Sequence, residues 1–245
     1  MLSKSEAKYI QSLKDKKSRT DHGRFIAEGP KIVNDLLNDH AEEIECIYAT
    51  SKWLQENNNA STRVPVKTVE DFELEKISFL QTPQQVLAAV KIPGRIFEPF
   101  AVNEWSLLLD GIQDPGNMGS ILRIADWFGI HSIYCTTDTA DIYNPKVVQA
   151  AMGSLLRVKV FYGDAESWLS GTRNPVYPAL LSGQNIFTLP KTEPGIIIIG
   201  NEGKGIRPSL LNQDYKAITI PRVGHAESLN AAVATAIILG TLVNK

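Results

Sequence analysis

The second half of the chain contains several short runs of aliphatic residues, each bounded by glycine, proline or polar residues. These runs do not alternate between polar and apolar side chains. Continuous apolar runs of this length are typical of strands that are buried on both faces of a parallel sheet. Helical segments separate them, so the sequence predicts an α/β unit with an open, mostly parallel sheet. The runs are SLLLD, HSIYCTT, LRVKVFY, VYPALL, GIIIIG and YKAITIP.

The first half of the chain predicts a smaller α/β domain. The stretch KSEAKYIQSLKDKKSR has the pattern of a polar helix, and FIAEGPKIVNDLLND that of a strand turning at Gly29-Pro30 into a helix. Further strands are expected at ECIYAT, VPVKTV and QQVLAAVKI. The segment PGRIFEPFAVNEW breaks the pattern and favours a linker. We therefore expect a small domain over residues 1–95, a linker over 96–104 and the parallel-sheet domain over 105–245.

Composition narrows the class of protein. The content of 43% hydrophobic and 21% charged residues is ordinary for a globular chain of 245 residues. The polar start MLSKSEAKYI has no secretory signal, and the longest apolar segment, AAVATAIILGTLV, is too short to cross a bilayer. We expect a cytoplasmic protein whose Cys46 and Cys135 are free thiols. The four histidines are scattered, so no metal site is expected.

The charge is small overall and uneven along the chain. The net charge of −2 argues against a binder that is basic throughout. Residues 1–24, however, contain seven Lys or Arg and three acids, which gives 7 − 3 = +4. Such a patch is suited to a polyanion, although a solvated helix face has the same composition. Charge alone does not separate these interpretations.

Three loops of the second half follow predicted strands, where open parallel sheets bind their ligands. They are GIQDPGNMGS, GNEGKGIRPS and IPRVGHAESLN. Lys204 is followed by Gly205 rather than Ser or Thr, which excludes a P-loop, and no G-x-G-x-x-G follows SLLLD, which argues against a nicotinamide cofactor. The remaining interpretation is a loop whose glycines let the backbone approach a bulky ligand, with Glu202 beside it.

Taken singly, each of these motifs also has an ordinary structural explanation. Ser228 or Asn230 could simply cap the helix that follows, and Asn117 could bond within its own turn. Arg123 lies in the apolar helix ILRIADWF, where a guanidinium is either an exposed flank or a positive charge held beside a pocket for a phosphate or a forming anion.

The three loops in combination resemble the motifs of one family. The chain has Asn117-x-Gly119-x-x-x-Arg123-x-Ala125, then GNEGKG from Gly200 to Gly205, then Ile220-Pro221 followed by Ser-Leu-Asn. This order is similar to that of the SpoU (TrmH) family of SPOUT methyltransferases, over about residues 105–245. The stretches FIAEGPKIVNDLL and TPQQVLAAV resemble the family's small, ribosomal-protein-like RNA-binding domain.

The resemblance implies properties that spacing could not supply. It implies a trefoil knot in the C-terminal domain, S-adenosylmethionine bound in the knot, and a homodimer whose active site is completed across the interface. It implies transfer of a methyl group to a ribose 2′-hydroxyl of structured RNA. The separate front domain favours ribosomal RNA. A tRNA 2′-O-methyltransferase and a non-catalytic, ribosome-associated RNA-binding protein are the alternatives.

The resemblance also assigns roles to individual residues. Arg123 is expected either to take the proton or to bind a phosphate and stabilise the forming alkoxide, and Glu202 to hold Arg123 or the RNA. Relatives often have Arg and Ser where this chain has Gln149 and Ala151, so contacts made there are not carried over. The catalytic and substrate-positioning set is Asn117, Arg123, Glu202, Ser228 and Asn230. The cofactor set is Leu181, Ser182, Gly183, Gly200, Gly203, Ile220 and Leu229.

Overall fold

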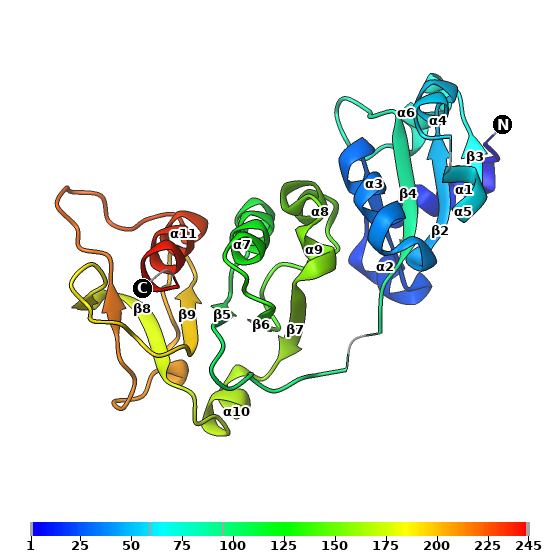
Figure 1. The fold of residues 1–245 in the computed structure, drawn as a ribbon. Coiled ribbons are helices and arrows are strands. Elements are labelled where there is room, and N and C mark those ends of the chain that lie inside the picture. Colours follow the sequence, from blue (N-terminus) through cyan, green and yellow to red (C-terminus); the bar gives the residue numbers. More distant parts are fainter. Residues whose placement is uncertain (1, 59, 95, 244–245) are drawn as a thin grey trace. The chain divides into compact units, whose positions relative to one another are not determined.

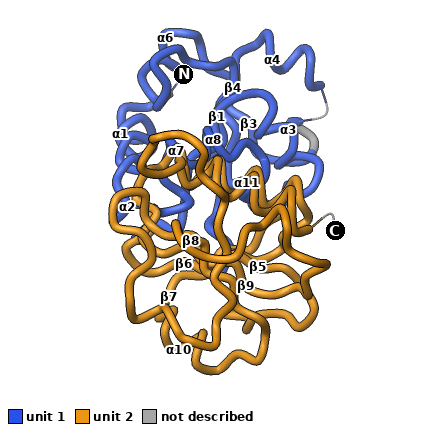
Figure 2. The backbone as a smooth tube through the Cα atoms, turned by 90° about the vertical axis from the view of Figure 1, so that its left-hand side faces the viewer, with its two compact units in different colours: residues 1–94, 141–156 blue, residues 95–140, 157–245 orange. Residues whose placement is uncertain are grey.

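The computed structural model describes residues 2–58, 60–94 and 96–243. The chain forms two compact units, shown in Figure 2. Unit 1 consists of Met1–Gly94 and Asp141–Leu156, and unit 2 of Arg95–Ala140 and Arg157–Lys245. Both units are α/β, as the sequence predicts.

Unit 1 contains a four-stranded mixed sheet in the order β1-β4-β2-β3 (Figure 1). The central β4 is antiparallel to both of its neighbours, whereas β2 and β3 are parallel. Every residue of β4 except the last is buried, which agrees with the apolar run QQVLAAVKI. The strands are β1 (Arg24–Glu28), β2 (Ile44–Ala49), β3 (Val66–Thr68) and β4 (Val86–Lys91).

The helices of unit 1 begin where the sequence has caps. Pro30 opens the helix after β1, as expected from the Gly-Pro turn, and Thr50 and Ser3 cap two others. The first 22 residues, expected to begin with one helix, form two, because the chain turns at Leu13 and buries it completely. The helices are α1 (Lys4–Ser12), α2 (Lys16–His22), α3 (Pro30–Asp39), α4 (Ser51–Glu56), α5 (Ala60–Arg63) and α6 (Asp71–Ile77).

Two of the seven basic residues near the N-terminus form ion pairs within unit 1. Arg19 is only 3% exposed; it donates to the Leu13 carbonyl at 3.0 Å and pairs with Asp141 at 2.6 Å. Arg24 forms an ion pair with Glu45. A buried cation whose partner is present cannot serve a polyanion, so the basic surface is smaller than the sequence suggests. Its exposed members are Lys4, Lys8, Lys14, Lys16 and Lys17.

Residues 141–156 belong to unit 1, although the sequence places them inside the second domain. The helix α8 (Pro145–Ala151) contacts β1, and the rings of Phe25 and Tyr143 lie 4.9 Å apart. Gln149 and Ala151, where the chain departs from the family pattern, both lie on α8; Gln149 is exposed and Ala151 is fully buried. The short α9 (Ser154–Arg157) follows. The domain boundaries remain a prediction.

Unit 2 is built on a six-stranded sheet in the order β10-β8-β9-β5-β6-β7, and each of its strand pairings in the described residues is parallel. This confirms the sheet predicted from the apolar runs. The strands are β5 (Ser106–Asp110), β6 (Ser132–Thr136), β7 (Lys159–Gly163), β8 (Val176–Asn185), β9 (Ile196–Gly200) and β10 (Ile218–Thr219), with the 3₁₀ helix η2 at Pro208–Leu210.

The strand order brings two distant loops together. β5 and β9 are neighbours, with Asp110 opposite Gly200 at their carboxyl ends. After β5 the chain continues to β6 on one side, whereas β10, which follows β9, lies on the other side. A reversal of this kind leaves a crevice between the departing loops, which is where open parallel sheets bind ligands.

Two helices of unit 2 lie side by side in the same direction. They are α7 (Pro115–Trp127) and α11 (Ala231–Leu242), drawn in green and red in Figure 1. Near their N-termini, Asn230 Nδ2 donates to Asn117 Oδ1 at 2.7 Å. Near their C-termini, a Cβ added at Gly240 would lie 3.4 Å from the Phe128 ring. The two helices are therefore also neighbours near their C-terminal ends. The third helix of unit 2 is α10 (Ala165–Ser170).

An aromatic cluster occupies the other end of unit 2. The rings of Phe100 and Tyr134 lie 4.1 Å apart, and Phe97 stacks on Trp168 at 5.3 Å. Residues from the segment expected to be a linker therefore pack within this unit. No helix in the described ranges is long and apolar enough to span a membrane. The trefoil knot implied by the family resemblance remains a prediction.

Candidate functional site

A cleft of about 860 Å³ opens in unit 2 beside the ends of β8, β9 and β10. Three chain segments line it: residues 179–182, residues 199–206 and a long stretch from Ile218 to Leu229. The start of α11 closes it with Ala231 and Ala234. Its volume is that of a site for a cofactor-sized ligand.

The glycine-rich loop after β9 is folded tightly against the strand that precedes it. Asn201 and Gly205 exchange two backbone hydrogen bonds, at 3.1 and 2.9 Å. The Asn201 side chain accepts hydrogen bonds from the backbone of Gly203 and Lys204. A Cβ at Gly200 would lie 2.4 Å from the carbonyl carbon of Gly205, so only glycine permits this turn.

Six of the seven predicted cofactor residues line the cleft. Gly183 does not, although it directly follows Ser182. A Cβ at Gly183 would lie 2.8 Å from the Ala217 backbone, so this glycine serves the close approach of β8 to the segment before β10. The residues that line the cleft therefore do not support the prediction that Gly183 binds the cofactor. The six residues are Leu181, Ser182, Gly200, Gly203, Ile220 and Leu229.

A chain of side-chain hydrogen bonds joins the three predicted loops. Asn117 Nδ2 donates to Glu202 Oε1 at 2.5 Å, and Asn230 Nδ2 donates to Asn117 Oδ1 at 2.7 Å. Glu202 and Ser228 line the cleft. The structure therefore brings Asn117, Glu202 and Asn230 together, with Ser228 on the adjoining loop. Glu202 binds Asn117 and makes no hydrogen bond or ion pair with Arg123 in the described part of the chain.

Asn230 has two roles at once. Its Oδ1 accepts hydrogen bonds from the backbone of Ala232 and Val233 and caps α11, while its Nδ2 binds Asn117. The helix cap and the site contact, which the sequence presented as alternatives, are therefore compatible. Asn117 is itself fixed at the start of α7, because its backbone N–H donates to Asp114 Oδ1 at 2.8 Å. Both residues are thus held in position at the N-terminal ends of helices.

Arg123 lies on the exposed face of α7. Among the described residues it forms no hydrogen bond and no ion pair. Because Ile121, Leu122 and Ala125 are buried around it, the helix is anchored while the guanidinium faces solvent. An unpaired guanidinium keeps all of its donors available for an external anion.

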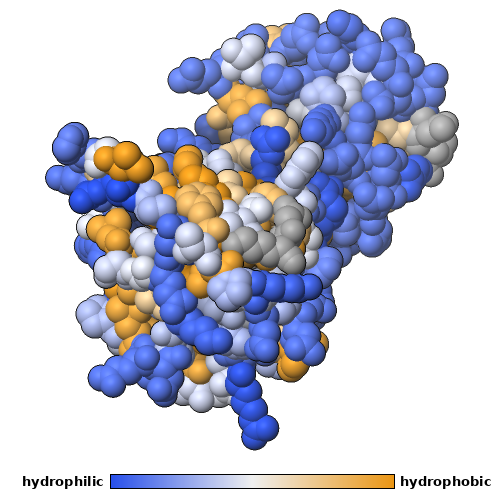
Figure 3. Space-filling model, turned by 60° about the vertical axis from the view of Figure 1, so that its left-hand side comes forward, coloured by the Kyte–Doolittle hydropathy of each residue, from blue (hydrophilic) through white to orange (hydrophobic). Residues whose placement is uncertain are grey.

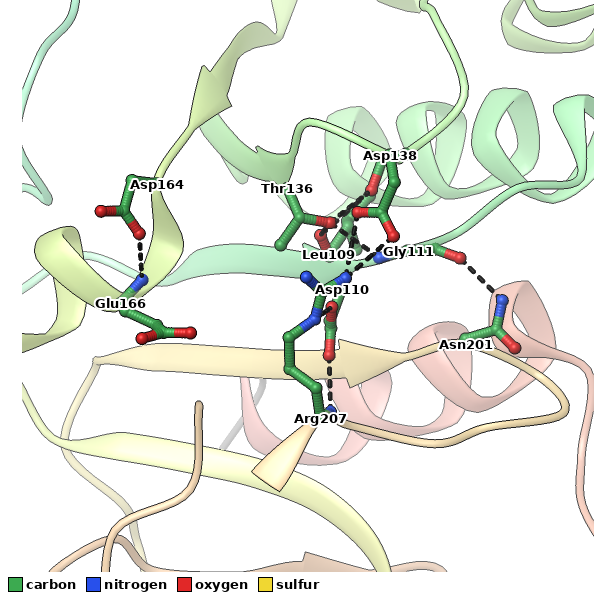
Figure 4. Close-up of polar contacts among 10 residues, drawn as sticks. Leu109, Asp110, Gly111, Thr136, Asp138, Asp164, Glu166, Asn201 and Arg207 are labelled. Carbon is green, nitrogen blue, oxygen red and sulfur yellow. Dashed lines mark hydrogen bonds and ion pairs between the residues drawn. The ribbon is translucent and has the colours of Figure 1, made fainter. Parts of the chain in front are cut away.

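Sequence reasoning missed a cluster of charges at the carboxyl ends of the strands, shown in Figure 4. Asp110, at the end of β5, is 2% exposed. Its Oδ2 accepts the backbone N–H of Arg207 at 2.7 Å, and its Oδ1 lies 2.6 Å from Arg207 Nε. Arg207 also donates to both carboxylate oxygens of Asp138, at 3.0 and 2.9 Å. The signal in the sequence was the aspartate that ends the buried run SLLLD.

The charges of this cluster reinforce one another. A hydrogen bond from Thr136, together with Arg207, holds the pKa of Asp138 below its ordinary value. Burial alone would lower the pKa of the Arg207 guanidinium, but Asp138 and Asp110 outweigh it and raise that pKa. The cluster ties together the segments at the ends of β5, β6 and β9. Asn201 adds a further link, because its Nδ2 donates to the Gly111 carbonyl at 2.7 Å.

Metal-ligating and thiol groups are not part of this arrangement. Within residues 2–58, 60–94 and 96–243, no three His, Cys, Asp or Glu side chains lie together as metal ligands would. Cys46 and Cys135 are free thiols, and burial raises the pKa of both.

The fold and the cleft define an α/β protein of the class that binds a cofactor at the carboxyl ends of parallel strands, with polar side chains from three loops at the cleft. The chain belongs to the SpoU rRNA methylase family, whose model matches residues 104–240. The MRM3-like substrate-binding domain matches residues 4–88. This confirms the resemblance seen in the three motifs.

Individual relatives extend over nearly the whole chain. The chain is 30% identical to the 23S rRNA (guanosine(2553)-2′-O)-methyltransferase RlmP of Bacillus subtilis, over 94% of this chain and 92% of that protein. It is similar to a solved structure from Porphyromonas gingivalis assigned to the TrmH family of RNA methyltransferases, with 38% identity, a TM-score of 0.87 and 98% of both chains covered. It is also similar to an AdoMet-bound rRNA methyltransferase from Sinorhizobium meliloti, with 28% identity, a TM-score of 0.83 and 98% and 95% coverage.

The tight turn after β9 gives a test with a matched control. Gly200→Ala forces a Cβ into the Gly205 backbone and is expected to cost about 1–3 kcal/mol of unfolding free energy. It should also weaken S-adenosylmethionine binding at least tenfold. Gly203→Ala, in the same loop, meets nothing closer than 3.7 Å and should change stability by less than about 0.5 kcal/mol. Urea denaturation and calorimetric titration measure both. Equal losses of unfolding free energy from the two substitutions would contradict the role of Gly200 in the turn.

Proposed function

We propose that this protein is an S-adenosylmethionine-dependent enzyme that methylates a ribose 2′-hydroxyl in structured RNA, most favourably ribosomal RNA. The observation that carries the proposal is the bonded series Glu202–Asn117–Asn230 beside the cleft, whose member Asn117 lies on the same helix as the unpaired Arg123. It joins amide groups suited to a ribose, a cleft of cofactor size and a cation suited to a phosphate or alkoxide. The relatives named as 2′-O-methyltransferases support the same activity.

The residues of the cleft fit S-adenosylmethionine. Ile199, Ile218 and Ile220 give apolar walls for an adenine ring, and the loop backbones give donors and acceptors for its edge. The carboxylates of Glu202 and Glu227 also line the cleft and complement a sulfonium cation. When bound, S-adenosylmethionine supplies an electrophilic methyl group.

The side chains around the cleft would align the nucleophile and stabilise its charge. Asn117 and Asn230 hold each other in a fixed orientation, so their position requires no reorganisation when a ribose binds. Guanidinium groups stay protonated in proteins, which makes Arg123 a poor base and a good partner for a phosphate or a forming alkoxide. In this assignment the hydroxyl proton leaves to water, and Ser228 contacts the ribose.

Loss of the cation should slow the chemical step. We expect Arg123→Ala to reduce the single-turnover methylation rate about 10²- to 10³-fold, the range for removing one stabilising donor. Arg123→Lys should recover part of the rate, since it restores charge without the planar fork. The affinity for S-adenosylmethionine should change less than twofold, because Arg123 does not line the cleft. Near-normal turnover of Arg123→Ala would refute the role.

We also propose that two copies of the chain form a homodimer that completes the site. Hydrophobic side chains gather on the face of unit 2 in Figure 3. Val223 is 100% exposed, and Leu181, Leu229 and Val233 are also exposed, around the cleft and at the start of α11. Every residue from Pro221 to Asn230 is exposed. A patch of this kind is typical of an interface.

The dimer has a direct measurement. Light scattering should give twice the 27.0 kDa mass of the chain. Val223→Asp/Val233→Asp should give the single-chain mass, because two charges would be buried without partners. Leu211→Ala, an exposed residue outside this patch, should leave the mass unchanged. A single-chain mass for the unaltered protein would contradict the proposed homodimer.

Unit 1 would bind the RNA. The match of residues 4–88 to a substrate-binding domain and the exposed lysines of α1 and α2 support this role. A dedicated RNA-binding unit favours ribosomal RNA over tRNA. Recognition would depend on shape and 2′-hydroxyl contacts. A cytoplasmic location, expected from the sequence, goes with this proposal.

The lysine surface can be tested with two double variants that change the overall charge by the same amount. Lys16→Glu/Lys17→Glu should weaken binding to protein-free ribosomal RNA about tenfold at 100 mM salt and reduce the slope of log K against log salt by about 1–2. Lys31→Glu/Lys52→Glu changes the charge equally at exposed positions on α3 and α4 and should have a smaller effect. Fluorescence anisotropy over a salt series measures both. Equal weakening would show that α2 is not the contact surface.

The non-catalytic alternative predicts a different outcome. A ribosome-associated protein of the same fold would bind RNA and S-adenosylmethionine without transferring a methyl group. Mapping of 2′-O-methylated sites in ribosomal RNA and tRNA from cells with and without the protein separates the alternatives. A site lost from ribosomal RNA supports the proposal, a site lost from tRNA supports the tRNA alternative, and no lost site supports the non-catalytic one.

A further inference from the structure

Trp127 is an exposed aromatic residue that the proposed reaction does not use. It is the last residue of α7, and its side chain is 84% exposed. The other large side chains of α7 that face the sheet are buried, so the helix does not need Trp127 for packing. An indole left in water forgoes the burial free energy that such a ring usually contributes to folding. Its exposure therefore points to a ligand or partner.

Trp127 shares its face of α7 with Arg123. Helical positions advance by about 100°, which places Gly116, Ser120, Arg123 and Trp127 within about 60° of one another. Gly116 and Ser120 are small, so only Arg123 and Trp127 project far from this stripe. They are four residues apart, about 6 Å along the axis. This is close to the spacing of successive nucleotides in an extended strand.

The charges beside Trp127 favour a polyanion. Arg123 is unpaired among the described residues, and Arg157, which is 45% exposed, has its NH2 group 2.7 Å from Oδ2 of Asp126, the residue before Trp127. Arg157 thus balances the charge of Asp126, and Arg123 adds a positive charge that no carboxylate of the described residues balances by an ion pair. Cations interleaved with an exposed aromatic ring are the pattern of single-strand binding surfaces, where bases stack on the ring and arginines follow the backbone.

The surrounding side chains do not favour a second copy of the chain at this point. The exposed hydrophobic residues assigned to the dimer lie on the lip of the cleft and at the start of α11. Trp127 is at the opposite end of the helix pair, where Phe128 meets Gly240. It is separated from Asn117 by ten residues, about 15 Å along α7. A strand with its target ribose at Asn117 would place a nearby base at Trp127.

We propose that Trp127 is a stacking site for an unpaired RNA base flanking the methylated nucleotide, so that the outer face of α7 guides a single strand across Arg123 towards the cleft. This inference rests on the proposed function, because it takes the RNA to pass over Arg123. It assigns to unit 2 an RNA-binding surface of its own, in addition to unit 1. The substrate would accordingly be unpaired around its target nucleotide.

The stacking site predicts a defect in RNA binding without a defect in cofactor binding. With a 20-nucleotide unpaired oligoribonucleotide as the probe, Trp127→Ala should raise Kd about 5- to 30-fold, the effect of losing one stacked base. Trp127→Phe, which keeps a ring, should recover most of the affinity. In methylation of ribosomal RNA, Trp127→Ala should raise KM with kcat within twofold. Affinity for S-adenosylmethionine should be unchanged, and Leu211→Ala should match the unaltered protein.

Fluorescence provides a second readout. The chain has four tryptophans, and a stacked base quenches the indole that it covers. The oligoribonucleotide should quench the unaltered protein, and most of this quenching should be absent in Trp127→Phe, even if Trp127→Ala folds poorly. Unchanged Kd, KM and quenching would overturn the inference, as would a loss of dimer mass in Trp127→Ala, which would identify a second copy as the partner. If the unaltered protein quenches but methylates no RNA, the proposed function fails and the stacking site stands.

Discussion

The ion pair between the buried carboxylate of Asp110 and Arg207 is the interaction on which the site depends. Asp110 sits at the carboxyl end of β5, where a charge without a partner would destabilise the unit strongly, and Arg207 provides that partner through both its backbone N–H and its guanidinium. Arg207 in turn reaches Asp138 after β6. Three loops that are far apart in sequence are thereby held at fixed positions. The side chains of the candidate site therefore do not have to hold these loops in position themselves.

The consequence is a division of labour between two arginines. Asp110 and Asp138 share Arg207 as their ion-pair partner. Asn117, Glu202 and Asn230 bond in series, and Arg123 stays unpaired in the described chain. A guanidinium with a built-in carboxylate would be a weaker ligand for phosphate. The fold therefore satisfies Arg207 internally and leaves Arg123 available to an external anion.

Much of the fold and part of the site were predictable because they depend on local patterns. Continuous runs such as SLLLD and GIIIIG specify strands buried on both faces, and the loops that follow such strands meet at one edge of the sheet. These patterns singled out the three loops, and the family resemblance then assigned Asn117, Glu202 and Asn230 to one site. The turn at Gly29-Pro30 was equally predictable from the sequence, since Pro30 begins a helix.

What escaped prediction depends on contacts between distant residues. Nothing local distinguishes Arg19, which is buried against Asp141, from the exposed lysines around it. The break between α1 and α2 follows from the burial of Leu13, and the glycine at 183 is required by the backbone at Ala217. Residues 141–156 pack with the first unit because of contacts to β1 that no spacing reveals. In each case the local structure is determined by a contact with a residue that is distant in sequence.

The parallel arrangement of α7 and α11 has an electrostatic consequence. The peptide dipoles of both helices place their partial positive charge at the end where Asn117 meets Asn230. The carboxylate of Glu202 lies at the same point, because it accepts the Asn117 amide. The positive ends of the two helices and this carboxylate attract each other, which helps to hold the glycine-rich loop against the start of α7.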